Sequence, residues 1–150
     1  RQYLEKGTNS TSTDWANFAG IYIKMCDQVD SLDHAKAVGY YTQAMDVYEK
    51  MTEKFPTLKD WCWVAEASVA LGKLKDLDKV RDLYMKVAEY EEAKADKSDA
   101  NTKNYLVAAY YFLGYYYAGK NDAETSKSYF EKLIQIDPEN AEAKKALGLE

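Results

Sequence analysis

A pair of tyrosines offers the clearest surface chemistry in this chain. Tyr111 and Tyr115 are four residues apart, so in a helix they would lie on one face. Their rings could stack on a peptide or on a sugar ring, and their hydroxyls could form hydrogen bonds. The alternative is that they pack against a helix that begins near Asn140. The sequence therefore predicts either a binding surface or an internal contact at this pair.

Catalytic side chains are sparse by comparison. Glu66 stands among small and apolar neighbours and is the best candidate for a carboxyl with a perturbed pKa, but acid–base catalysis needs a second group. The single histidine, His34, follows Asp30 and Asp33 without the glycine and final glutamate of a calcium-binding loop, so we interpret this segment as a solvated turn. The sequence contains no glycine-rich phosphate loop and no Gly-x-Ser-x-Gly motif. We therefore predict that the protein is not an enzyme and needs no cofactor or metal ion.

The cysteines also lack a motif. Cys26 and Cys62 do not have the Cys-x-x-Cys spacing of a redox or zinc site. Two buried free thiols are therefore favoured over a disulfide.

Composition narrows the class of protein further. The net charge is −5, from 25 acidic and 20 basic residues, and no stretch concentrates lysine or arginine, which disfavours nucleic acid as a partner. The weakly polar run Tyr105 to Gly119 is shorter than the ~20 residues of a membrane-spanning helix, so we predict no transmembrane segment. The chain starts without methionine and with a sequence typical of mid-helix, so we expect a fragment or a processed form of a soluble protein, cytoplasmic or periplasmic.

The elements that hold the tyrosine pair are predicted to be two helices. A helix is expected over residues 106–119, capped by Asp99 or Asn104 and ended by Gly119. After a polar turn, a second helix carries its apolar residues at helical spacing and stops at Asp137-Pro138. Its apolar residues are Phe130, Leu133, Ile134 and Ile136.

This helical hairpin recurs upstream. Leu83 to Val87 repeats the pattern of Tyr129 to Leu133, which predicts helices over about 58–72 and 76–95. An earlier hairpin begins near Trp15 and ends near Pro56. Extra residues around 26–40 either lengthen both of its helices or form a loop.

Residues 107–140 resemble one tetratricopeptide repeat, through Tyr110, Leu113, Gly114, Tyr117 and the segment Phe130 to Pro138. Trp15, Phe18, Ala19 and Tyr22 fit the same family's Trp-x2-Leu-Gly-x2-Tyr pattern, with Phe and Ala replacing Leu and Gly. The resemblance implies an all-α solenoid of about three helix-turn-helix hairpins in a right-handed superhelix, with partial helices at both ends. It implies a single domain over 1–150, with units at about 12–58, 59–98 and 99–140. A partial helix would precede them at Leu4 to Lys6, and a terminal helix would follow at 140–148.

The same resemblance separates packing residues from surface residues. Gly114 and Ala19 would let a partner helix approach closely, and one of Trp61 and Trp63 would be in the core. The large side chains expected to form the core are Trp15, Phe18, Tyr22, Tyr48, Tyr84, Tyr110, Leu113, Tyr117 and Phe130.

A concave groove lined by the first helix of each pair is the expected binding surface. Its candidate residues are Asn17, Glu66, Val69, Tyr111 and Tyr115. Some family members clamp a terminal carboxylate with Lys, Asn and Arg. The comparable places here hold Ala16, Gly20, Ala65 and Tyr111, and only Asn17 retains a suitable amide. We therefore expect apolar and hydrogen-bonding contacts in the groove rather than a carboxylate clamp.

The sequence favours a non-enzymatic scaffold, part of a longer protein, that binds a protein or peptide. Two other functions stay open. One is a structural spacer or a self-association module that uses exposed repeat edges. The other is a helical domain of a surface protein that binds nutrients or glycans.

Overall fold

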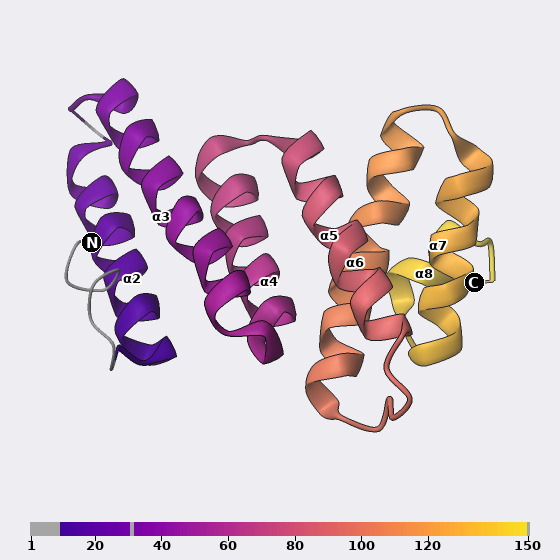
Figure 1. The fold of residues 1–150 in the computed structure, drawn as a ribbon. Helices are drawn as coiled ribbons and strands as arrows, with labels where there is room; N and C mark the ends of the chain where they lie inside the picture. Colours follow the sequence, from indigo (N-terminus) through magenta and orange to yellow (C-terminus); the bar gives the residue numbers. More distant parts are fainter. Residues whose placement is uncertain (1–9, 31, 150) are drawn as a thin grey trace. The chain divides into compact units, whose positions relative to one another are not determined.

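The computed structural model describes residues 10–30 and 32–149, and these residues form helices and no strands (Figure 1). The predicted all-α class is confirmed. The helices are α2 (Ser12–Val29), α3 (His34–Lys54), α4 (Lys59–Val69), α5 (Leu77–Glu92), α6 (Ala100–Gly119), α7 (Ala123–Ile136) and α8 (Ala141–Ala146). Two short segments join them: the 3₁₀ turn η1 (Pro56–Leu58) and the π-helical turn η2 (Ala70–Leu74). The helix predicted at Leu4 to Lys6 lies outside the described residues.

The chain forms two compact units, Arg1–Asp76 and Leu77–Glu150. The middle predicted hairpin, 59–98, is divided between them, because α4 belongs to the first unit and α5 to the second. The boundaries of the repeat units, and the superhelix, stay predictions.

In the first unit α2 and α3 form a long antiparallel hairpin, and α4 packs on α3 (Figure 1). The extra residues around 26–40 lengthen both helices and do not form a protruding loop. A capping box starts α2: the Thr11 hydroxyl accepts from the Asp14 amide at 3.3 Å, and the Asp14 carboxylate accepts from the Thr11 amide at 2.8 Å. Asp33 caps α3 by accepting from the Lys36 amide at 3.1 Å.

Both cysteines are free and buried in this first unit, which confirms the prediction. The Cys26 thiol donates to the Ala37 carbonyl at 3.4 Å. Burial raises the pKa of Cys26 to about 11 and the pKa of Cys62 to about 12. Both groups are therefore neutral thiols near pH 7.

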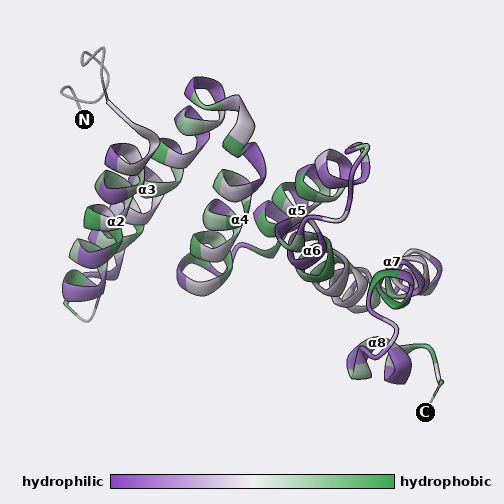
Figure 2. Ribbon diagram, turned by 90° about the horizontal axis from the view of Figure 1, so that it is seen from below, coloured by the Kyte–Doolittle hydropathy of each residue, from purple (hydrophilic) through white to green (hydrophobic). Residues whose placement is uncertain are grey.

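The second unit is a succession of antiparallel helices, α5, α6 and α7, with α8 packed on α7 (Figure 1). Of the two predicted caps for α6, the structure uses Asp99, whose carboxylate accepts from the Asn101 amide at 2.7 Å. Asp122 starts α7 and Asn140 starts α8 in the same way. Hydrophobic and hydrophilic residues alternate along α5 and α7, as expected of amphipathic helices, whereas α6 carries apolar residues on nearly every face (Figure 2).

Gly114 brings α6 and α7 into close contact, as predicted. A Cβ atom at this position would lie 2.7 Å from the Phe130 Cζ atom, so only glycine leaves room for the ring. The Ser126 hydroxyl, also on α7, donates to the Gly114 carbonyl at 2.8 Å. Most of the predicted core is buried: Trp15, Tyr48, Tyr84, Tyr110, Leu113 and Phe130, while Phe18, Tyr22 and Tyr117 are half-buried.

Candidate binding site

Helix α6 carries aromatic rings around its circumference, and the neighbouring helices cover most of them. Tyr110 is buried and donates a hydrogen bond to Glu92 of α5. Tyr117 stacks on Tyr129 of α7, with ring centroids 5.8 Å apart. Tyr111 and Tyr115 remain 42% and 43% exposed. These two side chains are therefore the aromatic surface that α6 offers to another molecule.

The exposed pair is held in a defined geometry. The Tyr111 and Tyr115 rings meet edge to face, with centroids 5.0 Å apart. Tyr115 also meets Phe130 edge to face at 5.2 Å. Its hydroxyl donates to Glu142 Oε2 at 2.6 Å, and this hydrogen bond, with burial, raises the pKa of Tyr115 to about 12. The Tyr115 hydroxyl is therefore neutral and oriented toward α8.

The structure thus combines both predicted alternatives at this pair. Tyr115 does contact the helix that follows Asn140, through Glu142, yet close to half of its side chain stays open to solvent. No motif pointed to Glu142, which was predicted only as part of a helix over 140–148. Its partner is far away along the chain, and the contact depends on how α8 packs.

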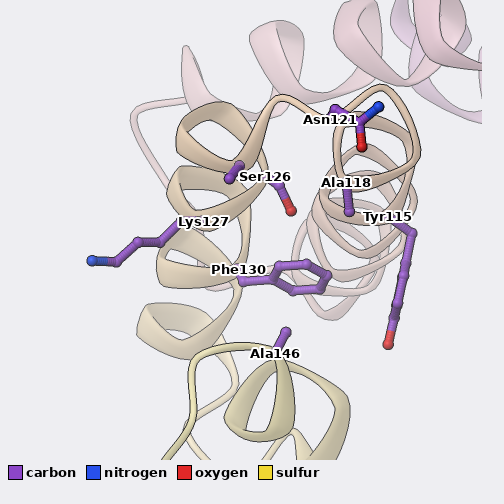
Figure 3. A pocket seen from close by; sticks show the side chains of 8 residues that line it. Tyr115, Ala118, Asn121, Ser126, Lys127, Phe130 and Ala146 are labelled. Atoms are coloured by element: carbon purple, nitrogen blue, oxygen red, sulfur yellow. The ribbon is translucent and has the colours of Figure 1, made fainter.

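A pocket of about 480 Å³ lies beside Tyr115, among α6, α7 and α8. Tyr115 forms one wall and the Phe130 ring projects into the space above Ala146, while the Lys127 side chain points away from that ring (Figure 3). The remaining lining residues are Ala118, Asn121, Ala123 and Ser126. The pocket is therefore apolar at its centre, with polar groups at its edge.

The other candidate residues belong to the first unit. Asn17 is exposed on α2. Glu66 and Val69 on α4 are only 2% and 6% exposed, so in this structure they are interior residues. The structure brings Tyr111 and Tyr115 together, and it leaves Asn17 as the accessible candidate of the first unit.

A small groove in the first unit was not predicted. It has a volume of about 210 Å³ and runs between the starts of α2 and α4, lined by Ser12, Thr13, Ala16, Met51, Leu58 and Trp61. Trp61 is 37% exposed and meets Tyr48 edge to face at 5.8 Å. Its neighbour Trp63 is half-buried.

The polar turn at His34 has the character that the sequence predicts. The His34 Nδ1 atom lies 2.7 Å from Asp30 Oδ1, and both side chains are exposed. Within residues 10–30 and 32–149, no three His, Cys, Asp or Glu side chains are grouped to hold a metal ion. In the same part of the chain, no helix has the length and apolar character needed to cross a membrane.

Comparison with known families agrees with the predicted resemblance for the segment that contains the site. Residues 107–140 match the tetratricopeptide repeat family. The match spans Tyr111, Tyr115 and Phe130, so the exposed pair and the centre of the pocket lie within one repeat. No curated protein matches the chain.

Proposed function

We propose that the protein is a non-enzymatic interaction module that binds a segment of another protein on the exposed face of α6. The observation that carries this proposal is the Tyr111–Tyr115 pair, more than 40% exposed and directly beside a pocket with an apolar centre. Repeats of this family pair helices into recognition surfaces, which supports the same conclusion.

The pair suits recognition for physical reasons. Tyrosine presents a large rigid surface with few rotatable bonds, so little conformational entropy is lost when a partner covers it. The contacts of Tyr115 with Phe130 and Glu142 already hold one ring in place before binding. The adjoining pocket lies within the ~300–1,000 Å³ typical of ligand sites, and it could accept an apolar side chain of the bound segment.

The test begins with a displayed peptide library selected on the purified chain, followed by calorimetry with the enriched peptides. A Tyr111→Ala/Tyr115→Ala variant should lose ~10-fold or more in affinity, because buried aromatic contacts dominate such interfaces. An Ile21→Ala/Met25→Ala variant is the control, since those residues are 54% and 40% exposed at the same spacing on α2. Equal binding by the folded tyrosine variant and the parent would refute the proposal.

A second variant tests the pocket without removing the tyrosines. Ala118 lines the pocket near the end of α6, and Ala118→Leu would fill part of the space with a residue of good helix propensity. We expect weaker binding of peptides that place an apolar side chain there. Unchanged affinity would show that the pocket is not used.

The two other functions share parts of this surface and need their own measurements. Self-association would use exposed apolar residues such as Ile21, Met25 and Leu149, and it would appear as concentration-dependent mass in sedimentation. Glycan binding would use the tyrosine rings as a stacking platform. Calorimetric titration with oligosaccharides would give heat that disappears in the Tyr111→Ala/Tyr115→Ala variant.

A further inference from the structure

A recurring arrangement of three side chains points to the chemistry of the bound group. In it, a tyrosine hydroxyl donates to a carboxylate, and a basic side chain both pairs with that carboxylate and lies over the tyrosine ring. In the first unit, Tyr41 donates to Asp27 at 3.0 Å, and the Lys73 ammonium lies 2.6 Å from Asp27 and 5.7 Å from the Tyr41 ring centroid.

The second unit repeats this arrangement at two places. Tyr110 donates to Glu92, and Lys132 lies 2.9 Å from Glu92 and 5.5 Å from the Tyr110 ring centroid. Tyr116 donates to Asp78, and Arg81 lies 3.9 Å from Asp78 and 5.3 Å from the Tyr116 ring centroid. Lys73 and Lys132 each contact both a carboxylate and the negative face of an aromatic ring. Arg81 is a looser version, because its closest carboxylate is Asp82 at 2.8 Å and it also donates to the Tyr116 hydroxyl at 2.8 Å.

Tyr115 and Glu142 form the same tyrosine–carboxylate pair without the cation. The hydroxyl donates to Glu142 at 2.6 Å, both side chains are exposed, and no ion pair of Glu142 is found among the described residues. On the same helix Lys144 pairs with Glu139 at 2.8 Å. Lys145 is exposed one turn from Glu142 and is the basic residue of α8 best placed to compete for it.

The Glu142 carboxylate, the Tyr115 oxygen and the two tyrosine ring faces are the electron-rich groups of this site. Tyr115 uses its only hydroxyl proton on Glu142, so its oxygen can otherwise only accept. The Glu142 carboxylate keeps free lone pairs, and the ring faces of Tyr111 and Tyr115 carry negative potential. The net charge of −5 adds a weak long-range attraction for cations.

We infer that the Tyr111–Tyr115–Glu142 cluster binds a basic side chain, lysine or arginine, of the protein segment recognised by α6. This inference rests on the proposed function and specifies its ligand. The bound cation would pair with Glu142 and lie against the Tyr115 ring, completing the arrangement that Lys73, Lys132 and Arg81 complete elsewhere in the chain.

The test uses small probes that need no natural partner. Nα-acetyl-arginine amide and Nα-acetyl-lysine amide are titrated into the ¹⁵N-labelled chain, and the amide shifts of residues 111, 115 and 142 are followed. Nα-acetyl-citrulline amide is the uncharged control for arginine. We expect saturable shifts with the two cations and at least ~5-fold weaker binding of the citrulline compound, since the cation–π and ion-pair terms are then lost.

Variants assign the effect to the cluster. Glu142→Gln keeps an oxygen that can accept from Tyr115 but removes the charge, and it should weaken both cationic probes ~5-fold. Glu131→Gln removes an equal charge from α7 and should leave binding unchanged. If Glu142→Gln perturbs the shifts of α8, salt dependence is compared between Glu142→Gln and Glu131→Gln at ~0.02 and ~0.3 M salt: the two variants have the same net charge, so a steeper loss of binding in Glu131→Gln reports the direct contact with Glu142. Equal affinity for the arginine and citrulline compounds, or no response to either Glu142→Gln or salt, would overturn the inference.

The outcomes for the two proposals differ. Selected peptides that need Tyr111 and Tyr115 but contain no essential basic residue would refute the cation site and leave the proposed function standing. Cationic probes that bind while no peptide does would support the cation site and count against recognition of a protein segment. Absence of both kinds of binding would refute both.

Discussion

Replacing Gly114 by alanine tests the closest helix contact in the structure. The added Cβ would lie 2.7, 2.8 and 3.0 Å from three ring atoms of Phe130. Carbon atoms in contact normally stay ~3.5–4.0 Å apart, so the ring or the helix would have to move by roughly 1 Å. Overpacking of this kind costs ~1–3 kcal/mol, and alanine regains ~1 kcal/mol of helix propensity over glycine. We therefore expect a net destabilisation of up to ~2 kcal/mol.

Gly119 provides the matched control on the same helix, because a Cβ there would meet no atom within 4 Å. Gly119→Ala should be neutral or stabilising by up to ~1 kcal/mol. Hydrogen exchange of α6 and α7 amides is the suitable assay, since the three tryptophans, Trp15, Trp61 and Trp63, all belong to the first unit and would not report on the second.

The close contact between Gly114 and Phe130 has two further consequences. Because Phe130 projects into the pocket, its displacement in Gly114→Ala should also weaken peptides that use the pocket. Phe130→Leu removes ring atoms that clash, so the two substitutions together should cost less than the sum of the single ones. If Gly114→Ala increased the exchange protection of the α6 and α7 amides as much as Gly119→Ala does, the close contact would be refuted.

Three further predictions concern titration and packing. Burial disfavours ionisation of Glu92, but hydrogen bonds from Tyr110 and Lys132 outweigh it and hold the pKa of Glu92 below its usual value. Its contribution to stability is therefore present above about pH 4.5 and is lost as the pH falls through the lower, folded-state pKa. As the pH is lowered from ~6 to ~3, the melting temperature should fall less steeply for Glu92→Gln than for the parent. The Cys26 and Cys62 thiols, with pKa values of about 11 and 12, should react with iodoacetamide at pH 8 far more slowly in the native chain than in denaturant, and fast native labelling would contradict their burial. Leu113 is fully buried, so Leu113→Ala should destabilise the second unit by ~2–5 kcal/mol by hydrogen exchange, whereas a loss below ~1 kcal/mol would contradict its burial.

Much of the helical pattern could be read from local signals. Polar caps, the Asp137-Pro138 stop and apolar spacing predicted the ends of α6 and α7, because these signals act within a few residues of each helix end. The start of α6 was less accurate, since the helix begins at Ala100 and not at residue 106. The helix predicted over 58–72 is α-helical to Val69 and continues as the π-helical turn η2 to Leu74, followed by Lys75 in the left-handed region with φ of 55°. Gly72 marked the approximate end of this helix, but glycine and not lysine is the usual residue for a left-handed conformation, so the conformation of Lys75 was not predicted.

The tyrosines show where sequence and tertiary structure divide. By itself the sequence determined that Tyr111 and Tyr115 share a helix face, because helical periodicity is a local property. The resemblance to a tetratricopeptide repeat predicted that Tyr110 and Tyr117 belong to packing. Only the tertiary structure decided that Glu66 and Val69 are interior, that Glu142 accepts from Tyr115, and that this pair has no cation of its own among the described residues. Burial and cross-helix partners depend on which faces pack together, and that is settled by contacts between residues far apart in the chain.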